Sequence, residues 1–332
     1  MALFSIPGVM RGVVIEKTGG VDVLQYKTDL PVPVPKDGEV LIKNDFIGIN
    51  FIDINFRSGL YPTPLPHILG VEAEGTIIST SFPSSTYDLK PGDRVVWIGQ
   101  GAYAEYSVCS ASKVHILPPN LKPSVAAACL SQGLTALIFI QKAYHVQKGD
   151  WILVQGAAGG VGLWLCRLLR AVGARVIGTA STEEKLKLAS ENGAEFVLNY
   201  SHDDISDRVL KITNGEGVAA VFDSVGAATF EVGLKVLARD GTMVSIGNTS
   251  GAVPPFKITE LSAKNLRLMK PSVFGYISTR EEFVRWAEKL FEFVVKENLD
   301  GMVYKVYSLA EVATAHADLE GRRTAGKLLL KV

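Results

Sequence analysis

Two hydrophobic patterns divide the chain. Up to about residue 130, short runs rich in β-branched residues are separated by glycine and proline, which predicts an antiparallel, barrel-like domain. These runs are GVVIE, EVLIKNDFIGIN, AEGTIIST and DRVVWI. From about Leu134 onwards, strand-like runs alternate with helical ones. That alternation predicts βαβ units built around a parallel sheet.

The clearest βαβ unit begins with the strand WILVQG and continues through a glycine-rich loop into a helix. Apolar residues recur at helical spacing in Val161, Leu165, Leu168, Leu169 and Val172. Gly173 stands where a helix C-cap belongs, and Thr182 is placed to cap the next helix. Glu183 and Glu184 would fall in the first turn of that second helix. The further strands predicted in this region are ARVIGT, EFVLN, AAVFDS and TMVSIG.

The alternation ends near Lys270. A long amphipathic helix follows over residues 279–298, and the chain ends with a helix and a strand. We expect this last strand to return to the first domain, which makes that domain discontinuous. The predicted division is residues 1–132 plus 272–332 for the barrel-like domain and 133–271 for the inserted parallel-sheet domain.

The composition mainly argues against certain classes of protein. A chain of 332 residues suits two domains, and the formal net charge of zero favours neither nucleic acid nor an anionic membrane. The three cysteines form no Cys-x-x-Cys pair, which argues against a disulfide framework or a cysteine-rich zinc lobe. We see no secretory signal and no apolar run approaching the ~18 residues of a membrane span. A cytoplasmic protein without membrane contact is therefore expected.

The loop GAAGGVG resembles a dinucleotide fingerprint, with Ala157 in place of its first glycine. Gly159 would let the backbone approach a pyrophosphate, and Gly162 would let the helix pack against the strand. The backbone N–H groups that open the helix would face the phosphates. The predicted loop contacts are Ala158, Gly159, Gly160 and Val161.

The end of the next strand indicates which dinucleotide binds. NAD-specific proteins place a carboxylate there for the ribose 2′-hydroxyl, whereas this chain has Gly178 to Ser181. A 2′-phosphate would meet no charge repulsion, could bond Ser181 and could be neutralised by Lys185. NADPH is therefore the predicted cofactor. The alternative is that Lys185 is an ordinary solvated helix residue, and the neighbouring Glu183 and Glu184 count in its favour.

Several motifs together resemble one family. They are GINFIDINFRSGLYP, LGVEAEG, KPGDRV, GAAGGVG, FDSVG and KPSVFGYI. In this order they resemble the medium-chain dehydrogenase/reductase superfamily, and within it the quinone oxidoreductases of the zeta-crystallin family. The resemblance covers essentially the whole chain. It implies an α/β protein in which a Rossmann doubly wound parallel sheet is inserted into a GroES-like, mostly antiparallel β-barrel, with a cleft between the two.

The chain departs from the zinc-dependent branch of that superfamily. Asn50 stands where that branch has a cysteine, and Gly70-Val71-Glu72 replaces its Gly-His-Glu motif. A catalytic zinc needs about three Cys, His or carboxylate ligands, so these replacements predict a reductase without zinc. Cys129 lies near the position of a third expected zinc ligand, but as a single cysteine it is expected to be a small buried apolar residue. The five histidines are unclustered and are expected to be structural or superficial.

The resemblance also implies site residues. Asn50, Asp53 and Tyr61 would line the cleft near the nicotinamide, and Tyr61 is the candidate to contact the acceptor. A packing residue in a proline-rich loop is the alternative for Tyr61. Asn55 stands where some relatives have a second tyrosine, which puts a two-tyrosine proton relay in doubt.

Further cofactor contacts follow from the same resemblance. Thr135 would contact the nicotinamide end, or else cap a helix. Tyr200 would lie near the adenosine, and Arg323 would reach the cofactor from the C-terminal segment unless it is simply solvated. Ser224 and Asn248 would end strands at the ligand-binding edge of the sheet, although Asn248 also suits a turn.

Quinone reduction by NADPH suits a site with little acid catalysis, because a quinone is already electrophilic and its reduced form is delocalised. Reduction of the C=C bond of an alkenal or enone is the alternative within enzymes. A third reading, implied by the family, is AU-rich RNA binding or a crystallin-like structural role as a secondary activity. The resemblance also implies a homodimer pairing through the last strand of the cofactor sheet, near TMVSIG.

Overall fold

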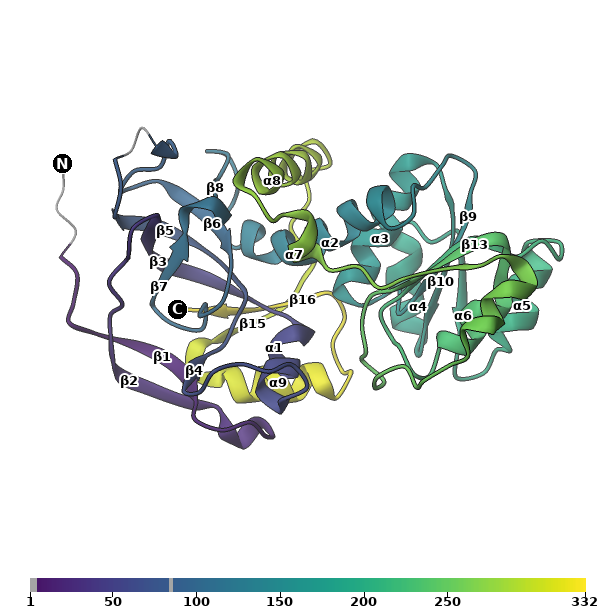
Figure 1. Ribbon diagram of the computed structural model, residues 1–332, viewed down its shortest axis with the longest axis horizontal. Helices are drawn as coiled ribbons and strands as arrows, with labels where there is room; N and C mark the ends of the chain where they lie inside the picture. The colour runs from purple at the N-terminus through teal and green to yellow at the C-terminus, as the bar shows by residue number, and fades with distance from the viewer. Residues whose placement is uncertain (1–4, 84–85) are drawn as a thin grey trace. The chain divides into compact units, whose positions relative to one another are not determined.

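The computed structural model describes residues 5–83 and 86–332, and it separates into two compact units (Figure 1). The first unit combines Met1–Ser131 with Ile277–Val332, and the second is Gln132–Tyr276. The chain therefore leaves the first unit once and returns to it. This is the discontinuous arrangement of a Rossmann domain inserted into a barrel-like domain.

The first unit is built mainly from antiparallel strands. Its three-stranded sheet has the order β2-β1-β4, and its seven-stranded sheet has the order β15-β16-β3-β5-β6-β8, with β7 also paired to β3. The strands are β1 (Val9–Ile15), β2 (Gln25–Pro31), β3 (Glu39–Ile49), β4 (His67–Ile68), β5 (Glu72–Thr80), β6 (Arg94–Ile98), β7 (Tyr106–Ser110), β8 (Val114–Ile116), β15 (Val303–Ser308) and β16 (Lys327–Lys331). The helices are η1 (Val21–Val23), α1 (Phe51–Ser58), η3 (Ala111–Lys113), α8 (Arg280–Lys296), η5 (Leu309–Glu311) and α9 (Val312–Glu320).

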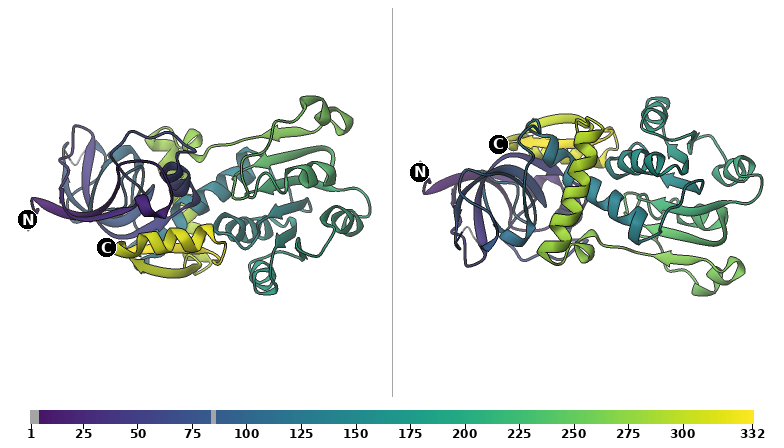
Figure 2. Two further views of the ribbon diagram at one scale, coloured as in Figure 1. Left: turned by 90° about the horizontal axis from the view of Figure 1, so that it is seen from below. Right: turned by 90° about the horizontal axis from the view of Figure 1, so that it is seen from above.

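Strand β3 organises this unit because it pairs with β5, β7 and β16, always antiparallel. The pairing of Leu329 with Gly48 brings the C-terminal strand back to the N-terminal half, as the sequence predicted. Figures 1 and 2 show this yellow segment among the purple and blue strands. Strand β15, which the sequence analysis did not anticipate, pairs parallel to β16.

The second unit contains a six-stranded parallel sheet of order β11-β10-β9-β12-β13-β14. Its strands are β9 (Trp151–Gln155), β10 (Arg175–Ala180), β11 (Phe196–Asn199), β12 (Val218–Asp223), β13 (Leu237–Ser245) and β14 (Arg267–Met269). Its helices are α3 (Gly160–Val172), α4 (Glu183–Glu191), α5 (Ile205–Ile212), α6 (Phe230–Val236), η4 (Ile258–Lys264) and α7 (Val273–Tyr276). Right-handed crossovers put α3 and α4 on one face of the sheet and α5 and α6 on the other.

The caps in this unit follow the sequence. Gly173 ends α3 in the left-handed conformation, with φ of 86°. Thr182 is the N-cap of α4, and its side chain accepts a hydrogen bond from the backbone N–H of Lys185. The edge of the sheet differs from the expectation, because β14 pairs beyond β13. The segment TMVSIG, which contributes to β13, is therefore not the last strand.

Helix α2 (Val125–Lys142) corrects the expectation about apolar runs. By length and composition alone this 18-residue helix could cross a membrane. However, 72% of the apolar window is buried inside the protein, and the buried core helix of a globular protein passes the same test. The helix contains the polar residues Ser131, Gln132 and Thr135, so it is not a continuous apolar run in the sequence.

Candidate active site

The glycine loop of the second unit has the geometry that its sequence predicts. Gly156 takes the left-handed position of the turn with φ of 73°, and Ala157 does not have a positive φ. A Cβ on Gly162 would lie 2.3 Å from the carbonyl oxygen of Gly156 and 2.8 Å from Cα of Ala157. Only glycine therefore lets α3 start this close to the end of β9.

The start of α3 is suited to an anion. Gly159 is the exposed N-cap of this 13-residue helix. The first N–H groups of a helix have no partners within it, and the helix dipole adds positive potential at that end. Gly160 and Val161 supply such groups, and the buried Ala158 supports the turn before them. A pyrophosphate fits this arrangement.

The end of β10 brings together residues predicted to contact the adenosine. The backbone N–H of Tyr200 donates to the carbonyl oxygen of Ala180 at 3.2 Å, which places Tyr200 beside Ser181. Tyr200 is 40% exposed, so its ring is accessible to a stacking ligand. Lys185 lies in the first turn of α4, and the Glu183 carboxylate accepts a 3.4 Å hydrogen bond from the Asn199 side chain.

Other predicted cofactor contacts are spread over both units. The Ser224 hydroxyl donates to the carbonyl oxygen of Gln155 at 3.0 Å, directly beside the glycine loop. Asn248 accepts a backbone hydrogen bond from Gly251 at 3.0 Å, as a turn residue does. Thr135 lies inside α2, so it does not cap that helix. In the first unit, Arg323 donates to the Asp318 carboxylate at 2.8 Å.

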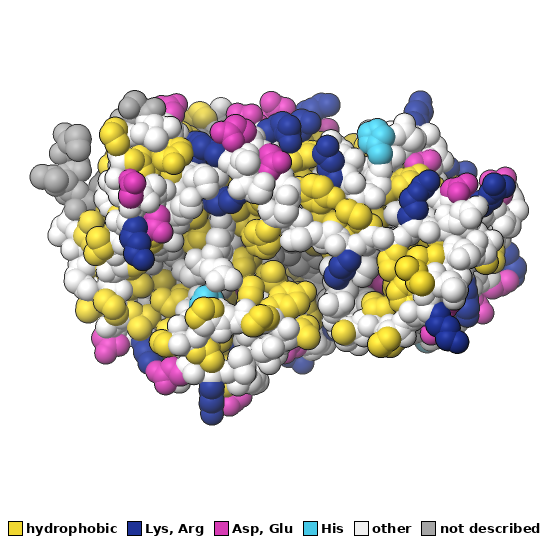
Figure 3. Space-filling model, viewed as in Figure 1, with side chains coloured by type: hydrophobic (Ala, Val, Ile, Leu, Met, Phe, Trp, Pro, Cys, Tyr) yellow, Lys and Arg dark blue, Asp and Glu magenta, His cyan; other side chains and the backbone are white. Residues whose placement is uncertain are grey.

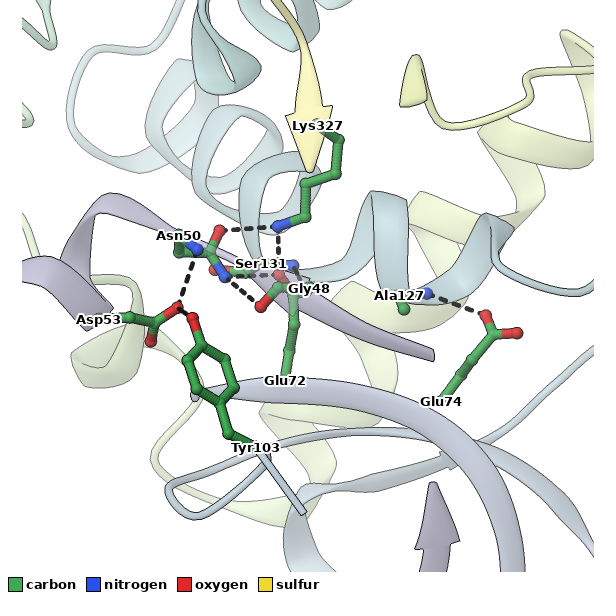
Figure 4. A network of polar contacts seen from close by, with 9 residues as sticks. All are labelled: Gly48, Asn50, Asp53, Glu72, Glu74, Tyr103, Ala127, Ser131 and Lys327. Atoms are coloured by element: carbon green, nitrogen blue, oxygen red, sulfur yellow. Dashed lines mark hydrogen bonds and ion pairs between the residues drawn. The ribbon is translucent and has the colours of Figure 1, made fainter. Parts of the chain in front are cut away.

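In the first unit, three buried side chains form a compact polar cluster (Figure 4). The Lys327 ammonium donates to Glu72 Oε1 at 2.5 Å and to Asn50 Oδ1 at 2.8 Å. The Asn50 amide nitrogen donates to the same Glu72 oxygen at 2.7 Å and to the carbonyl oxygen of Gly48 at 3.3 Å. Lys327 is 1% exposed and Glu72 is 0% exposed, so this ion pair is shielded from water.

Strand β5 also holds helix α2 through carboxylates. Glu72 Oε2 accepts the backbone N–H of Ser131 at 2.7 Å. Two residues further on, Glu74 accepts the backbone N–H groups of Ser124 and Ala127 at 2.5 and 3.0 Å. Burial raises the pKa of Glu74. The free N–H groups of a helix start suit a carboxylate, so this contact fixes where α2 begins.

Asp53 joins a second buried chain of hydrogen bonds. Arg57 Nη1 lies 3.2 Å from His316 Nδ1, and His316 Nε2 and Asp53 Oδ2 each lie 2.9 Å from the Tyr103 hydroxyl. Because arginine only donates, Nδ1 accepts and Nε2 carries the proton. Donation then runs from Arg57 through His316 and Tyr103 to Asp53. Burial lowers the pKa of His316 to about 3, which keeps this ring neutral.

The far end of this chain anchors helix α1. Asp53 Oδ2 also accepts the backbone N–H of Asn50 at 2.8 Å, at the N-cap of α1. Arg57 Nη2 reaches Glu320 of α9 at 2.6 Å, so the two helices are tied together. Burial raises the pKa of Asp53 to about 7, and its Oδ1 has no hydrogen-bond partner in the structure. Asn50 and Asp53 are thus enclosed by protein, and Tyr61 is the accessible member of the predicted trio.

Tyr61 follows α1 in a loop of the same unit. Gly59 ends α1 with φ of 84°, and the backbone N–H of Tyr61 then donates to the carbonyl oxygen of Asn55 at 3.1 Å. The ring of Tyr61 meets the ring of Phe56 edge-on, with centroids 5.9 Å apart. Its predicted contact with the acceptor stays a prediction.

These residues do not fit a zinc ion. Within residues 5–83 and 86–332, no group of three or more His, Cys, Asp or Glu side chains converges as a metal site requires. The Glu72 carboxylate is already neutralised by the Lys327 ammonium. Burial raises the pKa of the Cys129 thiol well above its usual range, so Cys129 stays protonated and is a poor ligand.

Several residues of the two buried clusters in the first unit were not predicted from the sequence. Lys327 and Tyr103 were not singled out, and His316 and Glu72 were noted without a role. One signal was available, because Glu72, Glu74 and Lys327 are charged residues beside apolar runs in the strands EAEGTIIST and KLLLK. Such residues are almost never fully buried unless they are paired.

The ion pair gives a test of stability. In Lys327→Met the Glu72 carboxylate stays buried without its cation, so we expect a loss of about 3–5 kcal/mol in the free energy of unfolding. The double variant Glu72→Gln with Lys327→Met buries no charge and should recover much of that loss. Urea unfolding followed by tryptophan fluorescence measures both. If the double variant is no more stable than Lys327→Met, the loss does not come from an unpaired Glu72 carboxylate.

Asp53 gives a test of pH dependence. Its pKa is about 7 in the folded protein against 3.8 when unperturbed, so the folded state binds the extra proton between these values. The contribution of Asp53 to stability is therefore full below pH ~4 and is lost as the pH rises through ~7. We expect Asp53→Asn to gain stability relative to the unmodified protein between pH 5 and pH 8. Urea unfolding at both pH values checks this, and a constant difference would refute it.

Comparison with known proteins agrees with this geometry. The model of the alcohol dehydrogenase GroES-like domain matches residues 36–119, and that of the zinc-binding dehydrogenase matches residues 160–290. A protein of Schizosaccharomyces pombe described as a probable quinone oxidoreductase is 42% identical over 318 residues, which are 95% of each chain. A 2-haloacrylate reductase of Burkholderia is 33% identical over 333 residues, covering 97% of this chain and 99% of that protein.

A solved structure extends the likeness to the fold. The Escherichia coli quinone oxidoreductase, crystallised in complex with NADPH, matches with a TM-score of 0.92 and 39% identity, over 97% of this chain and 100% of that one. The fold, the order of the motifs and the sequence identity of about 40% over nearly the whole chain all indicate the same family. The chain therefore belongs to the quinone oxidoreductase family of the medium-chain dehydrogenase/reductase superfamily.

Proposed function

We propose that this protein reduces quinones with NADPH and without a metal. The balanced two-electron reaction consumes NADPH, one proton and a quinone, and it yields NADP⁺ and a hydroquinone. NADPH, when bound, supplies the hydride from its nicotinamide ring. The observation that carries the proposal is the cofactor half of the second unit, an anion-binding helix start beside a strand end that lacks a carboxylate.

Named residues would hold the cofactor in this proposal. The N–H groups at Gly159, Gly160 and Val161 would face the pyrophosphate, and Ser181 with Lys185 would bind the 2′-phosphate. Tyr200 would stack on the adenine, since it is exposed beside the end of β10. The remaining predicted contacts, Thr135, Ser224, Asn248 and Arg323, stay part of the proposal.

The acceptor half would be formed around Tyr61. The buried clusters of Asn50 and Asp53 would position α1 and the loop that carries Tyr61, rather than touch the acceptor. Asn50 in particular has its amide nitrogen and its amide oxygen engaged by Glu72, Gly48 and Lys327. The proton that completes the hydroquinone would come from water.

A second candidate is reduction of the C=C bond of a conjugated carbonyl compound. The likeness to a 2-haloacrylate reductase favours it, because that substrate class has an activated C=C bond. Quinone reduction remains our first choice because the relatives with higher identity are quinone oxidoreductases.

We place the reaction in the cytoplasm and expect a homodimer, for which the exposed sheet edge would be β14. We leave AU-rich RNA binding out of the proposal, because the formal net charge is zero.

A paired assay separates the two activities. NADPH oxidation is followed with 1,4-benzoquinone and, separately, with 2-propenal at matched concentrations. We expect the higher kcat/KM with the quinone, because its reduction needs no strong acid in the site. Turnover of 2-propenal alone would contradict the proposal and favour the second candidate.

Cofactor preference tests the role of Lys185. Removing a charged partner of the 2′-phosphate costs about 1.5–3 kcal/mol, so Lys185→Ala should weaken NADPH binding roughly tenfold or more. NADH binding should change far less. Fluorescence titration with each cofactor gives the two dissociation constants. Lys187→Ala is the matched control, since Lys187 lies in the same helix and pairs with Glu191 at 3.9 Å. Equal losses for NADPH and NADH would show that Lys185 does not recognise the phosphate.

A further inference from the structure

In the first unit, the rings of Tyr61 and His67 both lie near the ring of Phe56. Phe56 lies in the last turn of α1, Tyr61 in the following loop and His67 at the start of β4. The Phe56 ring centroid is 5.9 Å from that of Tyr61 and 6.5 Å from that of His67. The backbone of His67 is fixed by the sheet, because β4 pairs with β1 and aligns His67 with Ile15. Two polar aromatic groups therefore share one apolar support.

The polar atoms of this cluster are not used within the protein. Among the residues that the structure describes, neither the Tyr61 hydroxyl nor the His67 ring makes a hydrogen bond, and the buried Thr63 hydroxyl also lacks a partner. His316 differs, since both of its ring nitrogens are engaged. The Tyr61 and His67 side chains are only partly buried, so their polar atoms are open to water and available to a ligand.

The surroundings of these groups are apolar and exposed. Leu60 and Leu65 of the same loop are 50% and 43% exposed, and Tyr61 and His67 are partly buried. Figure 3 shows apolar side chains gathered over this part of the first unit, where Figure 1 has α1 and β4. Exposed apolar side chains beside polar groups that have no protein partner can contact a small molecule. We name Phe56, Leu60, Tyr61, Leu65 and His67 the aromatic loop patch.

The charge state of His67 suits a neutral oxygen acceptor. Burial lowers the pKa of His67 below its ordinary value of 6.5, so the ring is uncharged at neutral pH. A neutral imidazole presents one N–H donor and one acceptor nitrogen. Tyr61 presents an O–H donor. The aromatic loop patch therefore offers two uncharged donors beside one phenyl ring.

We propose that the aromatic loop patch binds a planar conjugated dicarbonyl ring, with the Tyr61 hydroxyl donating to one carbonyl oxygen and the His67 N–H to the other. The inference rests on the proposed function and deepens it. Both oxygens of a quinone gain negative charge on reduction, and donors aimed at such charge stabilise the transition state. An alkenal has a single carbonyl oxygen, so it would use one of the donors. His67 is then the residue that favours quinones over alkenals.

The experiment compares two substrates in variants of His67. His67→Phe keeps an aromatic contact with Phe56 but removes the N–H, and His67→Gln restores a donor. We expect His67→Phe to lower kcat/KM for 1,4-benzoquinone about tenfold, the value of one lost hydrogen bond of ~1.4 kcal/mol. The value for 2-propenal should change less than about twofold on the same scale. His67→Gln should recover most of the quinone activity.

The matched control is His115→Phe. His115 belongs to the same unit, stacks on Phe291 with ring centroids 5.6 Å apart and has its pKa lowered to about 4 by burial. Its substitution should leave the ratio of the two kcat/KM values unchanged. Thermal unfolding checks that each variant is folded, and if His67→Phe is not, His67→Leu replaces it in the same comparison.

The possible failures can be told apart. If the unmodified protein does not reduce 1,4-benzoquinone, the proposed function is wrong and the inference fails with it. If it does reduce the quinone but folded His67→Phe keeps the same ratio of quinone to alkenal activity, only the inference is overturned. A ratio that falls in His67→Phe and returns in His67→Gln supports it.

Discussion

The buried contact between the Lys327 ammonium and the Glu72 carboxylate is the constraint on which the first unit depends. It joins the last strand to β5 across 255 residues of sequence, and both side chains are buried. Neither charge can be buried alone, because desolvation of an unpaired ion costs several kcal/mol. Strand β16 therefore has one acceptable register on β3. Asn50 completes the cluster, which carries the constraint directly to the N-cap of α1.

The two units position their candidate residues by different physical means. In the second unit, backbone geometry prepares a place for an anion, through the left-handed turn at Gly156, the close approach at Gly162 and the helix start at Gly159. In the first unit, side chains from distant segments anchor helix α1, which precedes the loop that carries Tyr61. Helices α1 and α9 are tied together by the buried hydrogen bonds of Asp53, Tyr103, His316 and Arg57. A site built from backbone geometry is visible in the sequence as a local motif. A network of side chains from distant segments has no such motif.

Charge compensation in the first unit comes from the chain itself. The buried Glu72 carboxylate is neutralised by the buried Lys327 ammonium. A lysine is fixed by covalent attachment and cannot polarise a substrate from inside a filled cluster. In the proposed reaction, the chemistry would come from the cofactor and from neutral donors. That suits acceptors that are already electrophilic.

The sequence by itself determined the local elements and their order. The strand–loop–helix around GAAGGVG, the C-cap at Gly173 and the N-cap at Thr182 were predicted because each depends on residues within one or two turns. It also predicted that the last strand returns to the first unit. Only the tertiary structure decided which distant segments and side chains are in contact. The partner of Lys327, the chain from Arg57 to Asp53, and the strands β14 and β15 depend on contacts between segments far apart in sequence. A charge in an apolar strand shows that a partner must exist, but only the folded chain determines which one, because burial and distance arise after the segments pack.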